Sequence, residues 1–271
     1  MTLAAGAFRG RKEKSVACAI AGWYSRVVTS DRGQRFGVEV ELVGLERETV
    51  AAVLASQVGG EVLEASEGRF LVEQADGRQW RVEPDDSLGL WEPWAAEVVS
   101  PVLEVEDLEV LGPVVDALAQ AGGTTSPDCG VHVHLDAADY SPEVLCRFVQ
   151  EVIGIEPYMS LAFDISESRL ADFTRLLDER FVREFRANPP RSREELLKQW
   201  YGASESIEQA RLERYHRSRY RGLNLHSLAY RGTIEFRYFN STLDAPTLRR
   251  YILFCLLVAE RSRQLDEAGV R

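Results

Sequence analysis

The sequence predicts an α+β domain in which helices pack on one face of a β-sheet and the opposite face carries a polar site. One observation is that three segments, 35–43, 131–135 and 232–240, alternate apolar and polar residues with a period of two, as strands with two different faces do, and that a fourth, 96–101, is a short apolar run with one acid. The other is that Glu, His and Arg gather on the polar side of these segments. A solvated sheet face usually carries Lys, Thr and Ser as well. We therefore interpret the polar face as a functional site.

The segment 232–240 shows the alternation over its whole length. Read as a strand, it places Glu235 and Arg237 on one face, and we expect Thr233 and Phe239 on that face too. The opposite face carries the apolar side chains Ile234, Phe236 and Tyr238. An isolated Glu-x-Arg sequence most simply forms a surface ion pair. The three similar segments are what favour a site here.

Those three segments add acids and histidines to the same kind of face. Glu39 and Glu41 alternate with apolar residues in 35–43, and Glu97 is the one acid in the apolar run 96–101. His132 and His134 lie opposite the aliphatic residues of 131–135. If these strands share one sheet, the five groups from the three segments join Glu235 and Arg237 on one surface.

Four helices follow from apolar periodicity and from start and stop signals. Glycine pairs at 59–60 and 122–123 end the first two, and Ser141-Pro142 begins the third as N-cap and first helical residue. The apolar stripe of the last helix is expected to pack on the apolar face of the sheet. The four predicted helices are 47–58, 108–121, 142–164 and 244–265.

Four further strands complete the prediction. Three of them are 61–65, 69–74 and 78–83, and the Asp-Gly sequence at 76–77 predicts a hairpin between the last two. The fourth strand is 219–227, which would place Asn224 and His226 on one face.

The chain divides into an N-terminal extension, 1–30, to which we assign no function, and a domain, 31–271, that contains a charged helical insertion at about 166–221. The insertion has 13 Lys and Arg against 10 Asp and Glu, whereas the whole chain has a net charge of −11. Two interpretations remain open. The insertion is either a solvated helical segment or a lid that folds over the acidic face and meets a phosphate-bearing ligand.

Composition excludes several classes of protein. The net charge of −11 argues against nucleic acid as a partner, because phosphate backbones are bound by basic faces. No apolar run approaches the ~18 residues of a membrane span. The four cysteines form no CxxC pair and no dense framework, which fits a reducing compartment, so we expect a cytoplasmic protein.

The polar face has the chemistry of a divalent-cation site. Four Glu with one or two His favour Mg²⁺ or Mn²⁺ over zinc, which would call for more His or Cys, and over calcium, which prefers Asp-rich loops. So many inward-facing acids would repel each other without a cation. An arginine beside them is suited to neutralise a phosphoryl group. The sequence contains no P-loop and no GxGxxG motif.

Six short motifs lie along the chain, namely FGVEVE (36–41), DDSL (85–88), EVVSP (97–101), CGVHVH (129–134), RGLNL (221–225) and GTIEFR (232–237). Their order resembles that of the amidoligase family, a branch of the glutamine synthetase and glutamate–cysteine ligase superfamily. The resemblance covers about residues 35–260. Each motif alone is weak, but six in order are specific.

The resemblance implies an antiparallel sheet with helices on its back and an active site on its open face, as in glutamine synthetase. Matching residue by residue, it implies metal ligands at Glu39, Glu41, Glu97, His132 and Glu235. It implies cofactor contacts at His134, Arg221, Asn224 and Arg237. Of these residues, we expect Glu39, Glu235 and Arg237 to be catalytic. The acidic turn that usually reads Asp-Gly-Ser is Asp85-Asp86-Ser87 here, which leaves a role for Asp85 open.

The implied function is an ATP- and Mg²⁺-dependent (or Mn²⁺-dependent) carboxylate–amine ligase that forms an amide or peptide bond through an acyl phosphate. Its partners would be a carboxylate substrate and an amine substrate, each a small molecule, a peptide or a protein tail. Three alternatives stay open: a metal-dependent phosphotransferase or kinase on the same scaffold, a metal-dependent phosphohydrolase, and a non-catalytic nucleotide- or metal-binding protein.

Overall fold

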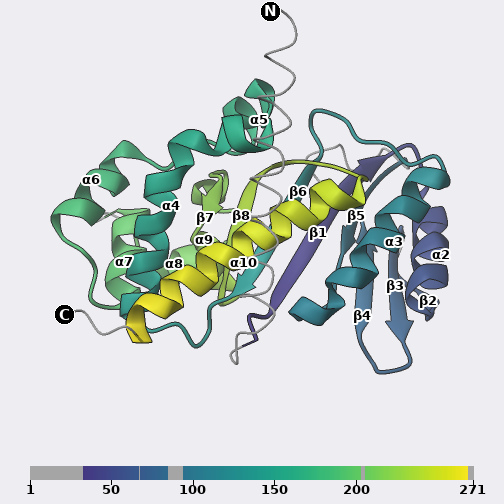
Figure 1. Cartoon of the computed structure of the whole chain (residues 1–271), viewed down its shortest axis with the longest axis horizontal. Helices are drawn as coiled ribbons and strands as arrows, with labels where there is room; N and C mark the ends of the chain where they lie inside the picture. The colour runs from purple at the N-terminus through teal and green to yellow at the C-terminus, as the bar shows by residue number, and fades with distance from the viewer. Residues whose placement is uncertain (1–32, 67, 85–93, 203–204, 268–271) are drawn as a thin grey trace, which may run out of the picture. The chain divides into compact units, whose positions relative to one another are not determined.

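Eight strands form one antiparallel sheet in a computed structural model that describes residues 33–66, 68–84, 94–202 and 205–267 (Figure 1). The spatial order is β2-β3-β4-β5-β1-β6-β8-β7, and every strand pair in it is antiparallel. The strands are β1 (Phe36–Val43), β2 (Gly60–Ser66), β3 (Arg69–Gln74), β4 (Gln79–Glu83), β5 (Ala95–Val99), β6 (Gly130–Asp136), β7 (Leu223–Asn224) and β8 (Thr233–Asn240).

Four of the helices cover one face of this sheet: α2 (Arg47–Val58), α3 (Leu108–Gln120), α4 (Pro142–Phe163) and α10 (Ala245–Glu267) (Figure 1). The shorter helices are α5 (Glu167–Asp172), α6 (Glu179–Ala187), α7 (Arg193–Tyr201), α8 (Ile207–Leu212) and α9 (His226–Tyr230), with 3-10 turns η2 (Val105–Asp107) and η3 (Arg217–Arg219). The predicted α+β class and the four long helices are confirmed.

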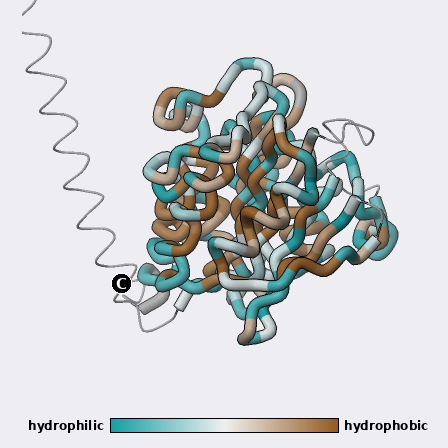
Figure 2. The backbone as a smooth tube through the Cα atoms, turned by 90° about the vertical axis from the view of Figure 1, so that its right-hand side faces the viewer, coloured by the Kyte–Doolittle hydropathy of each residue, from teal (hydrophilic) through white to brown (hydrophobic). Residues whose placement is uncertain are grey.

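Aromatic side chains join the covering helices to the sheet. The ring of Phe236 on β8 meets Phe148 of α4 edge to face at 5.8 Å, and Phe239 stacks on Tyr251 of α10 at 4.3 Å. The apolar residues of β1, Phe36, Val38, Val40 and Leu42, are all buried. Figure 2 shows apolar segments gathered in the interior of the described chain. This core holds the opposite face of the sheet in place.

The prediction for Phe239 is wrong, because β8 contains a bulge. The pairing of β6 with β8 shifts register between Val131 and Val133, which pair with Phe239 and Phe236. An extra residue in a strand reverses the alternation of side chains beyond it. Phe239 therefore turns toward α10, away from the face that holds Glu235.

The predicted strand over 219–227 is also wrong. Only Leu223–Asn224 forms a strand, and α9 begins at His226. The side-chain oxygen of Asn224 accepts a hydrogen bond from the backbone N–H of His226 at 2.9 Å, and such local bonds draw the chain out of an extended conformation. The His226 ring lies between the Tyr201 hydroxyl, at 2.7 Å, and the Glu213 carbonyl, at 3.0 Å.

Residues from Gln34 onward form one compact unit. The predicted extension, 1–30, and the acidic turn with Asp85 lie outside the described residues. The predicted insertion contains α5 to α8 and η3. No helix of the described chain is both long and apolar enough to span a bilayer.

Gly222 provides a test of this packing. A Cβ on Gly222 would lie 1.9 Å from the ring of Tyr238, which is fully buried and cannot move aside. We expect Gly222→Ala to lower the free energy of unfolding by about 1–3 kcal/mol or more, as overpacking does. Gly154→Ala on the exposed side of α4, where a Cβ would meet nothing within 4 Å, should instead stabilise by roughly 0.5–1 kcal/mol. Urea denaturation measures both, and equal effects would contradict this packing.

Candidate active site

The register of the sheet assembles the acids and histidines. The strands β5, β1, β6 and β8 are neighbours in that order. Within this row Glu41 pairs with Glu97, Glu39 with His132, and His134 with Glu235. Because paired residues on one face of an antiparallel sheet have Cβ atoms about 4.5–5.5 Å apart, pairing alone brings these side chains into contact.

The side chains meet at short distances. Nδ1 of His132 lies 3.1 Å from Oε2 of Glu39, and its Nε2 lies 3.5 Å from Oε1 of Glu41. Nε2 of His134 lies 3.3 Å from Oε1 of Glu39. Oε1 of Glu235 lies 3.9 Å from a ring nitrogen of each histidine. Glu39, Glu41, Glu235 and both histidines are buried, whereas Glu97 is partly exposed.

Among the described residues, two groups have ligand atoms that lie within 4.8 Å of one another, as metal ligands do. One is Glu39, Glu97 and His132, and the other is Glu39, His134 and Glu235. Glu39 belongs to both. Glu41 is in neither, and its Oε2 accepts a hydrogen bond from the backbone N–H of Gly130 at 2.5 Å. Carboxylates with imidazoles are a donor set that fits Mg²⁺ or Mn²⁺.

The surroundings favour ionised carboxylates. Burial alone would raise the pKa of Glu235, but Arg237 and the two histidines lower it to about 2. Burial likewise works against ionised Glu39, yet His134 and His132 hold its pKa well below the ordinary value. Burial and Arg237 lower the pKa of His132 to about 4, so His132 is neutral at neutral pH. The cluster thus presents anionic oxygens and a neutral imidazole.

The chain matches the model of one family, described as "putative amidoligase enzyme", over residues 32–259. It belongs to this amidoligase family. Comparison with curated proteins and with solved structures found no match. Membership indicates an amide-bond ligase, and the acids and histidines described above all lie within the matched residues.

Two side chains hold Glu235 from opposite oxygens of its carboxylate. Nη1 of Arg237 donates to Oε1 of Glu235 at 2.5 Å, and Nδ2 of Asn224 donates to Oε2 at 2.7 Å. Both donors are buried. The Nε of Arg237 has no hydrogen-bond partner among the described residues, which leaves one buried donor of the guanidinium available. The structure therefore brings Asn224 and Arg237 to the cluster, although their predicted cofactor contacts stay predictions.

Arg221 makes its contacts with the insertion instead. Its guanidinium donates to the carbonyl of Leu176 at 2.8 Å and to Asp178 at 3.1 Å, and it sits over the ring of Trp200. These partners belong to the insertion. These contacts are those of a residue that anchors the insertion. They do not test the predicted cofactor contact of Arg221, which stays a prediction.

Two arginines at the cluster were not among the predicted site residues. Nη1 of Arg231 lies 3.3 Å from Oε1 of Glu39, and although burial opposes its charge, Glu39 and Glu235 raise its pKa. Nη2 of Arg169, from α5, lies 3.3 Å from Nε2 of His132. Arg231 could have been noticed because it directly precedes the 232–240 segment. Arg169 carries no such signal, because α5 reads as a solvated helix.

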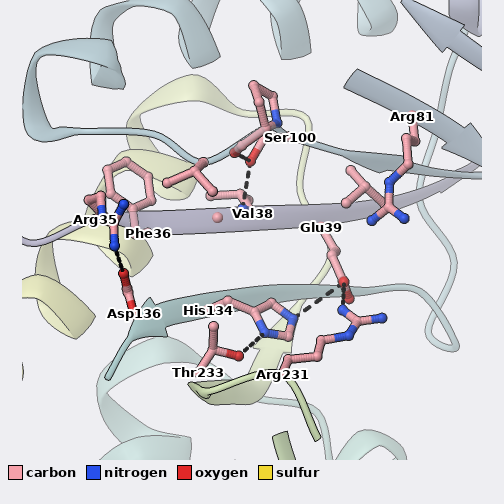
Figure 3. Close-up of a pocket in the computed structure, with 14 residues that line it drawn as sticks. Arg35, Phe36, Val38, Glu39, Arg81, Ser100, His134, Asp136, Arg231 and Thr233 are labelled. Atoms are coloured by element: carbon pink, nitrogen blue, oxygen red, sulfur yellow. Dashed lines mark hydrogen bonds and ion pairs between the residues drawn. The ribbon is translucent and has the colours of Figure 1, made fainter. Parts of the chain in front are cut away.

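Two pockets open beside Glu39, and both are lined by Glu39, His134 and Arg231. The insertion-side pocket is almost entirely polar and adds Glu97, Glu235, Asn224, His226, Arg214 and Arg219. The strand-side pocket runs along β1 and adds Arg35, Gly37, Arg81, Val99, Ser100 and Asp136 (Figure 3). Arg214 and Arg219 belong to the insertion, so part of that segment faces the acidic cluster.

The cluster predicts that divalent cations stabilise the fold. A cation that binds only the folded chain raises its stability by mass action, and it also relieves repulsion among the carboxylates. We expect the melting temperature to rise with millimolar Mg²⁺ or Mn²⁺, and the double variant Glu39→Gln/Glu41→Gln to abolish the rise. The exposed pair Glu179→Gln/Glu184→Gln on α6 is the control. An undiminished rise in the Glu39/Glu41 variant would contradict a site on β1.

The low pKa of Glu235 predicts a pH-dependent contribution to stability. The folded chain keeps Glu235 ionised down to about pH 2, whereas the unfolded chain protonates it near 4.5, so the unfolded chain binds more protons between these values. Stability should fall as pH falls through this window. Glu235→Gln resembles the protonated acid, so its stability deficit should be largest near neutral pH and vanish toward pH 2. Urea denaturation in EDTA measures it, and a deficit independent of pH would refute the assignment.

Proposed function

We propose that this amidoligase is an ATP-dependent carboxylate–amine ligase that uses Mg²⁺ or Mn²⁺. The observation that carries the proposal is the close grouping of Glu39, Glu97, Glu235 and His132, with Arg237 hydrogen-bonded to Glu235. Carboxylate and imidazole ligand atoms that lie within reach of one another fit a site for cations, and the arginine fits a site for phosphate.

The proposed reaction has two steps. An oxygen of the substrate carboxylate attacks the γ-phosphorus of ATP, the bond to the β-phosphate oxygen breaks, and ADP leaves with its electron pair. The nitrogen of the amine substrate then attacks the carbonyl carbon of the acyl phosphate. Inorganic phosphate leaves, the nitrogen gives up a proton, and an amide remains. In both steps negative charge develops on oxygens of the phosphoryl group. Catalysis therefore depends mainly on the positioning of the reactants and on the electrostatic stabilisation of that charge.

The residues have separate tasks in this proposal. Glu39, Glu97, Glu235 and His132 would hold the cations, with Glu41 fixing Gly130 beside them. A bound divalent cation supplies positive charge to phosphoryl oxygens. Arg237 would supply positive charge beside the transferring group, and Asn224 and Arg237 together fix the orientation of Glu235. His134, shared by both pockets, stands where nucleotide and carboxylate would meet.

The insertion-side pocket is the proposed entrance for the nucleotide phosphates. Arg214 and Arg219 line it opposite the acids, and guanidinium groups suit phosphate oxygens. This arrangement supports the lid interpretation of the insertion. We further propose a cytoplasmic location, which Cys146 and Cys255 support, because among the described residues neither forms a disulfide.

Hydroxylamine tests the ligase proposal without knowledge of the natural amine, because it converts acyl phosphates to hydroxamates. The protein is incubated with ATP, Mg²⁺, hydroxylamine and a panel of carboxylates. We expect ADP and hydroxamate in equal amounts with at least one acid. ADP with a stable phosphorylated product and no hydroxamate would indicate a kinase, and ADP that forms without any acid would indicate a hydrolase. No ADP under any condition would favour a non-catalytic module.

Two single variants should fail in different ways in that assay. Glu235→Gln loses an anionic ligand, so activity should fall steeply and recover in part at higher metal concentration. Arg237→Lys keeps the charge but loses the planar fork of donors, so turnover should fall by about 10²-fold or more with nearly normal metal dependence. Arg249→Lys, at an exposed ion pair with Glu109, is the control. Wild-type turnover in both site variants would sink the proposal.

A further inference from the structure

The strand-side pocket lies over the one position of β1 that has no side chain on the polar face. Gly37 occupies that position, between Glu39 of the same strand and Arg35, which directly precedes the strand (Figure 3). A Cβ on Gly37 would meet its nearest neighbour, Oγ of Ser100, at 3.8 Å, and the backbone there has no positive φ. Neither backbone conformation nor a close contact requires this glycine. The absence of a side chain at Gly37 leaves the bottom of the pocket unfilled.

The two ends of the pocket differ in charge. Arg81 and Arg231 lie at the end marked by Glu39, whereas Arg35 and its ion-pair partner Asp136 lie at the other end (Figure 3). Arg81 is close enough to Glu83 for an ion pair, at 3.4 Å, but 42% of its side chain is exposed. The guanidinium groups of Arg81 and Arg231 can therefore both receive an anion next to the acidic cluster.

The walls between these ends are largely apolar. Val99, Pro101 and Val102 form one side, and the volume is about 290 Å³, at the lower end of the roughly 300–1,000 Å³ of small-molecule sites. The polar groups of the strand-side pocket lie mainly at its two ends, whereas the insertion-side pocket is lined almost entirely by polar residues. A short aliphatic chain with one charged end matches the strand-side pocket.

We propose that the strand-side pocket binds the carboxylate substrate as an unbranched aliphatic acid, with its reacting carboxylate between Arg81 and Arg231 and its chain over Gly37. This inference rests on the proposed ligase function, because it places the acceptor carboxylate beside the residues that would hold the cations. It also assigns a specificity role to Gly37, since any side chain there would occupy the space of the acyl chain.

The contact between Arg231 and Glu39 connects the two pockets. Arg231 is 3.3 Å from Glu39 and lines both of them. A carboxylate bound by Arg231 in the strand-side pocket therefore lies next to phosphates entering from the insertion side. Transfer of a phosphoryl group to a carboxylate oxygen requires the two groups to lie side by side in this way.

Direct binding tests the pocket without ATP. Saturation-transfer NMR on the full chain with Mg²⁺ would compare sodium butyrate with the branched acid pivalate. Butyrate should bind more tightly. Arg81→Gln should weaken butyrate binding about tenfold, as loss of a charge-assisted contact does. Gly37→Val, which suits a strand and introduces no backbone strain, should abolish it.

Arg69→Gln is the matched control. Arg69 lies on the adjacent strand, pairs with the same Glu83 at the same 3.4 Å, and has a similar exposed fraction of 39%, but it does not line the pocket. It should leave butyrate binding unchanged. Melting temperatures confirm that each variant is folded.

Three results would overturn the proposal: no butyrate binding by the wild type, equal binding in Gly37→Val, or equal losses in Arg81→Gln and Arg69→Gln. Failure of the ligase function looks different. Suppose that butyrate binds and that Gly37→Val and Arg81→Gln weaken its binding as predicted, but that no acid yields a hydroxamate. That result would support the proposed binding pocket and refute the proposed ligase function. Hydroxamate formation that is insensitive to Gly37→Val would refute the pocket alone.

Discussion

The burial of several carboxylates on one face of a sheet is the constraint on which the rest of this structure depends. Charges of one sign at such short range destabilise a fold unless cations or hydrogen-bond donors compensate them. Here the compensation comes from every side of the cluster: Arg237 and Asn224 at Glu235, Arg231 at Glu39, and the backbone N–H of Gly130 at Glu41. The two histidines lie between the acids and keep Glu39 and Glu235 ionised.

The helical face of the sheet makes this arrangement possible. Four long helices and the aromatic contacts of β8 with α4 and α10 stabilise the apolar side, so that the polar side can hold groups that contribute little to stability by themselves. The bulge in β8 allows the strand to contribute side chains to both faces of the sheet. It turns Phe239 into the core while Glu235 and Arg237 remain on the acidic side. Membership of the amidoligase family is consistent with such a division between a stabilising face and a reactive one.

Period-two alternation sufficed to predict the strands that carry Glu39, His132 and Glu235, because each has one buried apolar face, and a short apolar run predicted the strand that carries Glu97. These patterns could not predict which strands are neighbours, since the pairing of Glu39 with His132 joins residues far apart in the chain. Resemblance to the family predicted that these residues share one site, but not the order of the strands. The bulge at β8 and the turn at His226 depend on contacts made by distant segments, such as Tyr201 with His226. Arg169 reaches the cluster from a helix whose sequence looks solvated.

The most direct test of this account is the position of bound Mn²⁺, measured by anomalous X-ray diffraction from crystals grown with the metal. We predict anomalous density at the cluster, with Glu39 as a ligand together with Glu97 and His132, with His134 and Glu235, or with both groups. Full occupancy of Mn²⁺ at exposed surface carboxylates, with no density near Glu39, would contradict the claim that the acidic face of this sheet is a metal-dependent active site.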